Sequence, residues 1–166
     1  MKKISLLIAS LAVASYAFAG TATVTYNAQI VADNTVTVNT QPNFGAFYIT
    51  GSATTGTATL NNTGNTVTTT ASSALTPVSS TGAASGSVTI SGTNGYTVAI
   101  TPPASVTINN GGSNSFTVTP TIALATCVVG TSCSAIGIGG SFPYGASASI
   151  VSGSYTGSGT ITATYQ

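Results

Sequence analysis

Short runs in which every second residue is apolar recur along most of the chain, and they constrain the fold more than any other feature. Residues 153–166, GSYTGSGTITATYQ, place Tyr155, Ile161, Ala163 and Tyr165 in one phase and hydroxyl residues in the other. Successive side chains of a strand point to opposite faces, so this pattern predicts strands with one buried and one wettable face. We therefore expect an all-β protein.

The expected strands are short and are separated by Gly, Asn, Ser and Pro. Asn110-Gly111 marks a hairpin turn, and Pro102-Pro103 separates two strands. Many short strands at close spacing are typical of a sandwich or a barrel. The expected strands are 22–30, 34–40, 44–50, 56–60, 65–70, 85–91, 95–101, 104–108, 115–119, 121–125, 146–151 and 159–166.

The first residues, 1–19, have the organisation of a secretory signal peptide. Lys2 and Lys3 precede an apolar stretch, and Ala17-Phe18-Ala19 forms a small-x-small cleavage site before Gly20. The apolar stretch is shorter than the about 20 residues that a membrane-spanning helix needs. We expect cleavage before Gly20 and export of the remaining chain.

Charge is almost absent, because the sequence contains two Lys, one acidic residue and no His. Removal of the signal peptide would leave Asp33 as the charged side chain. Phosphate would then have no Lys or Arg to neutralise it, so we expect no nucleic-acid binding. With no His and one carboxylate, we expect no catalytic residues, no metal site and no cofactor, and hence no enzyme.

The lack of charge also bears on association. Soluble proteins usually carry interspersed charge, and exposed strand edges are usually protected by it. Either hydroxyl groups alone keep this protein soluble, or its surface is built to associate.

Cys127 and Cys133 lie close together in CVVGTSC. In an exported protein, such a pair predicts one structural disulfide. A redox or metal site is the alternative, but the spacing is not Cys-x-x-Cys and no basic residue stands nearby to activate a thiol.

Thr-x-Thr recurs, at 21–25, 35–37, 66–70, 117–119 and 160–164. An ice-binding threonine array would require a fixed repeat period, and these intervals are irregular. We interpret the threonines as good strand formers on wettable faces.

A second alternating strand is predicted near the start of the exported chain. In residues 21–31, one phase is apolar and the other is polar. The apolar phase consists of Val24, Tyr26, Ala28 and Ile30.

The tail resembles that of chaperone–usher pilins. Tyr165 is penultimate, Gly153 is the fourteenth residue from the end, and the residues between them keep the same phase. The segments 42–60, 94–108 and 152–165 are similar to a family of secreted bacterial β-domains, domain of unknown function 4402.

The pilin resemblance implies an immunoglobulin-like β-sandwich that lacks its final strand. Residues 20–33 would be an N-terminal extension and 34–166 the pilin-like domain. A periplasmic chaperone would fill the vacancy first. The extension of the next subunit would then replace the chaperone at an outer-membrane usher, by donor-strand complementation.

The resemblance assigns two sets of interface residues. The donor strand would contribute Val24, Tyr26, Ala28 and Ile30, and the acceptor groove along the C-terminal strand would contain Gly153, Tyr155, Ile161, Ala163 and Tyr165. The implied function is a structural subunit of an extracellular pilus or fimbria that supports adhesion or biofilm formation.

Two other functions are compatible with the pattern. One is a self-contained, adhesin-like β-sandwich at the cell surface, whose first and last strands pair within one chain. The other is a small outer-membrane β-barrel, although such barrels usually end on an aromatic residue and here Gln166 follows Tyr165.

Overall fold

A computed structural model describes residues 23, 25–51, 53–70, 74–78 and 82–166. The chain divides into two units, Met1–Ile30 and Val31–Gln166, and we call the second unit the body. In the first unit, residues 23 and 25–30 form no strand. This differs from the expected strand at 22–30, because an extended segment becomes a strand only when a neighbour shares its hydrogen bonds. The predicted signal peptide and Val24 lie outside the described residues.

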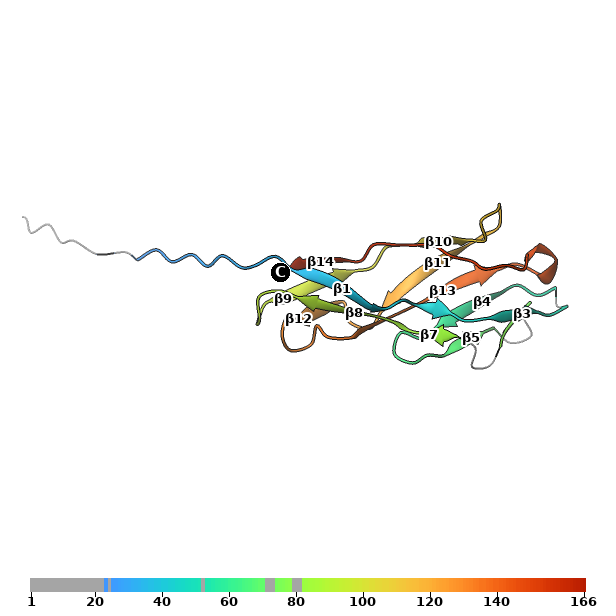
Figure 1. Ribbon diagram of the computed structural model, residues 1–166, viewed down its shortest axis with the longest axis horizontal. Coiled ribbons are helices and arrows are strands. Elements are labelled where there is room, and N and C mark those ends of the chain that lie inside the picture. The colour runs from blue at the N-terminus through green and yellow to red at the C-terminus, as the bar shows by residue number, and fades with distance from the viewer. Residues whose placement is uncertain (1–22, 24, 52, 71–73, 79–81) are drawn as a thin grey trace, which may run out of the picture. The chain divides into compact units, whose positions relative to one another are not determined.

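The described residues of the body form short strands and one turn of 3-10 helix (Figure 1). No described segment forms a helix long and apolar enough to cross a membrane. The elements are β1 (Thr35–Thr40), β2 (Asn43–Phe44), β3 (Phe47–Ile49), β4 (Gly56–Leu60), β5 (Val67–Thr69), β6 (Leu75–Pro77), β7 (Ala83–Ala84), β8 (Gly86–Ser91), β9 (Thr97–Thr101), β10 (Val106–Asn109), β11 (Ser115–Ile122), β12 (Thr126–Val128), β13 (Ile136–Tyr144), η1 (Ser147–Ser149) and β14 (Thr162–Tyr165).

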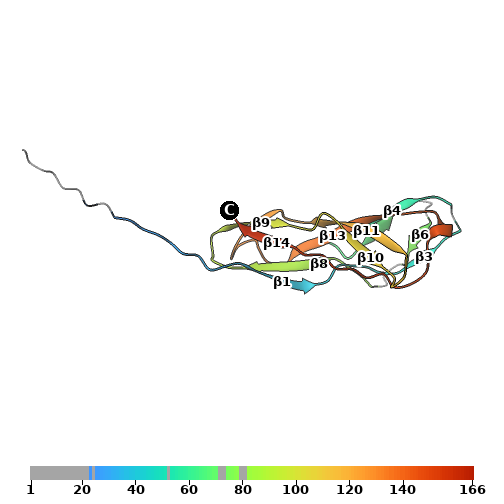
Figure 2. The same cartoon turned by 90° about the horizontal axis from the view of Figure 1, so that it is seen from above.

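Two antiparallel sheets form the sandwich (Figures 1 and 2). The larger sheet has the order β1-β8-β13-β11-β10, with β4 and β5 added beside β13. The smaller sheet has the order β12-β9-β14, and β2-β7 and β3-β6 form two small ribbons. The predicted all-β sandwich is confirmed.

The strand order is that of an immunoglobulin-like sandwich. Strands β1, β8, β13 and β11 correspond to A, B, E and D, and β9 and β14 correspond to C and F. Strand G would lie on the outer side of β14, and no strand of the described residues occupies that position.

The core has two parts, both built from the inward phase of the strands. The first lies between the sheets and contains Val88, Ile90, Val98, Ile100, Cys127, Val129, Cys133, Ile136 and Ile138. The second contains Ala58, Ala74, Leu75, Val118, Phe142 and Tyr144, with half-buried aromatic residues packed against it.

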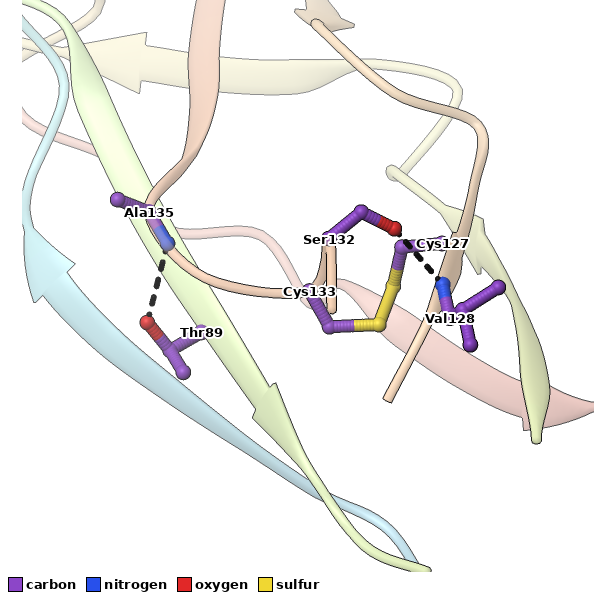
Figure 3. Close-up of a disulfide and its surroundings, with 6 residues drawn as sticks. All are labelled: Thr89, Cys127, Val128, Ser132, Cys133 and Ala135. Atoms are coloured by element: carbon purple, nitrogen blue, oxygen red, sulfur yellow. Dashed lines mark hydrogen bonds between the residues drawn. A yellow bond between two sulfur atoms is a disulfide. The ribbon is translucent and has the colours of Figure 1, made fainter. Parts of the chain in front are cut away.

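The predicted disulfide between Cys127 and Cys133 forms, and both residues are buried (Figure 3). Cys127 belongs to β12 in the smaller sheet. The Cys133 carbonyl accepts a 2.8 Å hydrogen bond from the Ile90 N–H in the larger sheet. The disulfide therefore ties the two sheets together along the side of the sandwich formed by β12.

The longest strand, β13, was not expected from the sequence. Gly137, Gly139 and Gly140 interrupt its apolar pattern. A side chain at Gly137 would collide with the backbone carbonyl of Asn62, so the glycine allows the β4–β5 loop to pack against the strand.

Two other expectations are corrected. Residues 146–151 contain η1 rather than a strand. The separate strands expected at 115–119 and 121–125 are replaced by one strand, β11, which continues through Pro120 and ends at Ile122, so that 123–125 form no strand.

We predict that Gly137→Ala lowers the free energy of unfolding by about 1–3 kcal/mol, the usual cost of overpacking. The added methyl group would meet the backbone of Asn62, which cannot move aside as a flexible side chain could. Gly51→Ala is the matched control, since nothing lies within 4 Å of a Cβ at that position. Urea denaturation monitored by circular dichroism measures both. Equal stability of the two variants would contradict the packing described for β13.

Candidate functional site

The C-terminal segment crosses from the larger sheet to the smaller one. Thr156 forms a bridge with Asn109, with two backbone hydrogen bonds of 2.9 Å, and β14 then pairs with β9. The continuous strand expected over residues 153–166 is therefore interrupted. Pro102 and Pro103 follow β9, and they have no N–H to donate to the facing segment.

Glycines allow this segment to lie directly on its neighbours. A side chain at Gly157 would collide with the carbonyl oxygen of Thr107, and one at Gly159 would meet Val106 and Pro103. Gly153 has φ 156°, which favours glycine, and it lies beside Asn110. The segment thus follows β10 and then β9 across the body.

One edge of β14 has no partner among the described residues. The Gln166 N–H donates to the Thr97 carbonyl at 3.1 Å, so these two residues form a hydrogen-bonded pair of the ladder between β14 and β9. Hydrogen-bonded and non-hydrogen-bonded pairs alternate along an antiparallel ladder. By this alternation, Thr162 and Thr164 bond to β9, whereas the backbone groups of Ala163 and Tyr165 face the other edge. The same two residues pack half-buried side chains against the core, as does Ile161.

Strand β1 presents a similar edge. The Ile90 N–H is directed to Cys133 rather than to β1, so the backbone groups of Val36 and Val38 face away from β8. Val38 is 49% exposed, although it pairs with the fully buried Val88 and points to the same side of the sheet. Part of the core is therefore open to solvent at this edge.

The edges of β1 and β14 lie next to each other on one side of the sandwich (Figures 1 and 2). We call this region the open side. No charged residue occurs in it. It consists of Val36, Val38, Ile161, Ala163 and Tyr165.

Tyr165 closes one end of the open side. Its hydroxyl accepts a 2.8 Å hydrogen bond from the Thr93 N–H, and its ring packs edge-on against Tyr96 at 5.9 Å. The Thr93 hydroxyl in turn accepts a 3.0 Å bond from the Ala32 N–H. The start of the body and the end of β14 are thus joined through one residue.

Tyr155 lies elsewhere, in an aromatic cluster. Its ring packs against Phe116 at 4.8 Å, and its hydroxyl donates to the Val151 carbonyl at 2.7 Å. The cluster also contains Phe44, Phe47, Phe142 and Tyr144.

The five predicted acceptor residues are therefore divided between two places. Ile161, Ala163 and Tyr165 meet at the open side, whereas Gly153 and Tyr155 lie near β10 and β11. Their role as an acceptor stays a prediction. Val36 and Val38 were not among the predicted site residues, although the alternation of 34–40 could have indicated them.

The predicted donor residues are exposed where the structure describes them. Tyr26 is 89% and Ile30 96% exposed, and Ala28 is also exposed. Their role as a donor strand likewise stays a prediction.

Residues 34–165 match the family described as Domain of unknown function (DUF4402). The chain belongs to this family. Comparisons with curated proteins and with solved structures found no match.

The DUF4402 domain includes both strands of the open side, because its matched region begins one residue before β1 and ends at Tyr165. Residues 23 and 25–30 precede it. Val31, Ala32 and Asp33, which the sequence placed in the extension, belong to the compact body.

We predict that Tyr165→Phe lowers the free energy of unfolding of the DUF4402 domain by about 1–3 kcal/mol, since the part-buried Thr93 N–H loses its acceptor. Tyr48→Phe removes a hydroxyl from a tyrosine that is more than half exposed, and it should change stability little. Thermal unfolding of both variants measures the difference. A Tyr165→Phe protein as stable as the control would show that the hydroxyl contributes nothing.

Proposed function

We propose that this chain is a structural subunit of an extracellular filament, in which residues 21–31 of one copy pair with the open side of another. The observation that carries the proposal is the edge of β14 that no strand of the described residues pairs with, in a sandwich with the strands A-B-E-D and C-F. Such an edge is a template for a strand from another chain.

The chemistry of the open side suits an apolar strand. Half-buried Ile161, Ala163 and Tyr165 supply apolar contacts, and the backbone groups of Ala163 and Tyr165 supply hydrogen bonds. Val24, Tyr26 and Ile30 would each contribute about 1.5–3 kcal/mol if fully buried. Each backbone hydrogen bond would add about 1 kcal/mol. These gains are offset in part by the entropy lost on association.

The arrangement would produce filaments rather than closed oligomers. Each copy would give its leading segment to one neighbour and accept a segment from another. Such a contact joins different surfaces of the two copies, and it can repeat without limit when the rotation does not close a ring.

Export follows from the signal peptide predicted at 1–19. A periplasmic chaperone is the expected first partner, because an uncovered apolar edge would aggregate, and an outer-membrane usher is the expected assembly site. The near absence of charge also favours assembly over a dispersed monomer. The filament would support adhesion or biofilm formation.

We predict that Ile30→Asp abolishes filaments, because a buried unpaired carboxylate costs more than the lost apolar contact. Gln29→Asp is the matched control, since residue 29 belongs to the polar phase and the added charge is the same. Electron microscopy of material sheared from cells measures the result, and the secreted amount of each variant checks export.

A deletion of residues 21–31 tests the donor segment as a whole and should also abolish filaments. Filaments formed by the deletion variant would contradict the donor assignment. A wild-type protein that remains a cooperatively folded monomer would contradict the proposed function itself.

We predict that Ala163→Pro blocks assembly while the body stays folded. The Ala163 N–H faces the free edge, so proline there removes no bond to β9 and places a ring where a donor strand would pair. Thr164→Pro is the comparison, because it removes a bond to β9 and should destabilise the body. Circular dichroism reports folding and electron microscopy reports filaments. Normal filaments from Ala163→Pro would exclude this edge as the acceptor.

A further inference from the structure

The sequence contains two Asn-Gly dipeptides, Asn94-Gly95 and Asn110-Gly111. An asparagine can react with its own chain, because its side-chain carbon Cγ and the backbone nitrogen of the next residue can close a ring. A following glycine favours this reaction, since it has no Cβ to shield its nitrogen. The two dipeptides are chemically alike, so the fold decides which of them reacts.

At Asn110, the fold brings the two reacting atoms together. Asn110 follows β10 in the turn that leads to β11. Its side-chain oxygen Oδ1 accepts a 3.1 Å hydrogen bond from the Gly112 N–H. This bond folds the side chain back over the peptide group between Asn110 and Gly111, and it places Cγ beside the Gly111 nitrogen. The Gly112 N–H can also stabilise the negative charge that Oδ1 gains when Cγ is attacked.

The Gly111 nitrogen is also easily released. Its N–H donates a 3.1 Å hydrogen bond to the side chain of Asn109, which is exposed. A rotation of the Asn109 side chain breaks this bond without disturbing the backbone. Gly111 is itself exposed, and nothing lies within 4 Å of a Cβ at that position, so water reaches the site.

At Asn94, the fold restrains the same two groups. The Gly95 N–H donates a 3.0 Å hydrogen bond to the backbone carbonyl of Val129, which is buried in the loop that the disulfide closes. The Asn94 side chain is directed to Gly130, since a Cβ there would come within 2.7 Å of its Oδ1. The Gly95 nitrogen therefore becomes available only when this part of the body opens.

We propose that Asn110 is a self-modification site, at which the folded protein converts the asparagine to aspartate and isoaspartate. The Gly111 nitrogen attacks Cγ of Asn110 and passes its proton to water. The Cγ–Nδ2 bond breaks, and Nδ2 takes up a proton and leaves as ammonia, so that a succinimide ring remains. Water then adds to one of the two ring carbonyl carbons. Opening of the bond from the Gly111 nitrogen to Cγ gives aspartate, and opening of its bond to the backbone carbonyl carbon gives isoaspartate.

The reaction adds a negative charge to a surface that has almost none. Either product carries a carboxylate at neutral pH. Asp33 is the charged side chain expected in the exported chain, so the new carboxylate would double the number of charged side chains. Charge opposes association of neighbouring molecules, so this surface becomes less prone to associate as the exported protein ages. The reaction needs the folded body and water, and it does not rest on the proposed strand exchange.

Water enriched in heavy oxygen tests the proposal. The secreted wild-type protein is incubated in it at mildly alkaline pH, so that each hydrolysed succinimide keeps one heavy oxygen atom. Chymotrypsin then cleaves the denatured protein in ordinary water after Tyr96 and Phe116, and mass spectrometry of the peptides measures the label. We expect peptide 97–116 to gain label about tenfold faster than the peptide that ends at Tyr96, because the Asn94 site must open first.

Two variants and one condition locate the reaction. Asn110→Gln should remove the label from peptide 97–116, since the longer side chain cannot close the same ring. Asn114→Gln is the matched control and should leave the label unchanged, since Asn114 is followed by Ser115 rather than by glycine. In denaturant, the two Asn-Gly dipeptides should react at similar rates, which assigns the difference to the fold.

Equal labelling rates of the two peptides in the folded protein would overturn the inference. Label that persists in the Asn110→Gln variant, or a folded wild-type protein whose peptide 97–116 gains none, would do the same. Absence of filaments from the wild-type chain would overturn strand exchange and leave this inference standing.

Discussion

The outer edge of β14 is the constraint on which the proposed function of this molecule depends. A strand edge carries hydrogen-bonding groups that need partners, and here the edge groups of Ala163 and Tyr165 have none among the described residues. Their side chains are half-buried in the core at the same time. One added apolar strand would therefore give hydrogen-bond partners to the backbone groups and cover the half-buried side chains at the same time. An uncharged edge of this kind is uncommon in proteins that remain monomeric.

The two sides of the sandwich are closed by different means. At β12, the buried disulfide holds the smaller sheet to the larger one, and the carbonyl of Cys133 is bonded to the central strand β8. At β14 and β1, no covalent bond or further strand of the described residues closes the sandwich, and Val38 is half exposed. A fixed side opposite an open one would allow the body to stay folded while an apolar strand enters or leaves. In the proposed filament, the disulfide would contribute to assembly indirectly, by holding the sheets together.

Much of the fold could be predicted from alternation alone. The strands β4, β8 and β9 lie within their expected ranges because their inward residues alternate cleanly with threonine and serine. The central strand β13 could not be predicted, since its glycines are required by neighbouring backbone that is distant in sequence, and glycine locally indicates a turn. Likewise, the break in the C-terminal strand depends on Pro102 and Pro103, which become its neighbours only in the folded chain.

The sequence by itself determined the class of the protein: all-β, with one disulfide and an alternating tail. Side-chain period, charge and cysteine spacing are properties of a short stretch of chain, so each can be recognised without the fold. Only the tertiary structure decided which edges are unpaired, that β1 joins β14 in the open side, and that Tyr165 is bonded through Thr93 to the start of the body. These features depend on which strands become neighbours, and hydrogen bonds between segments 61 and 72 residues apart leave no local pattern in the sequence.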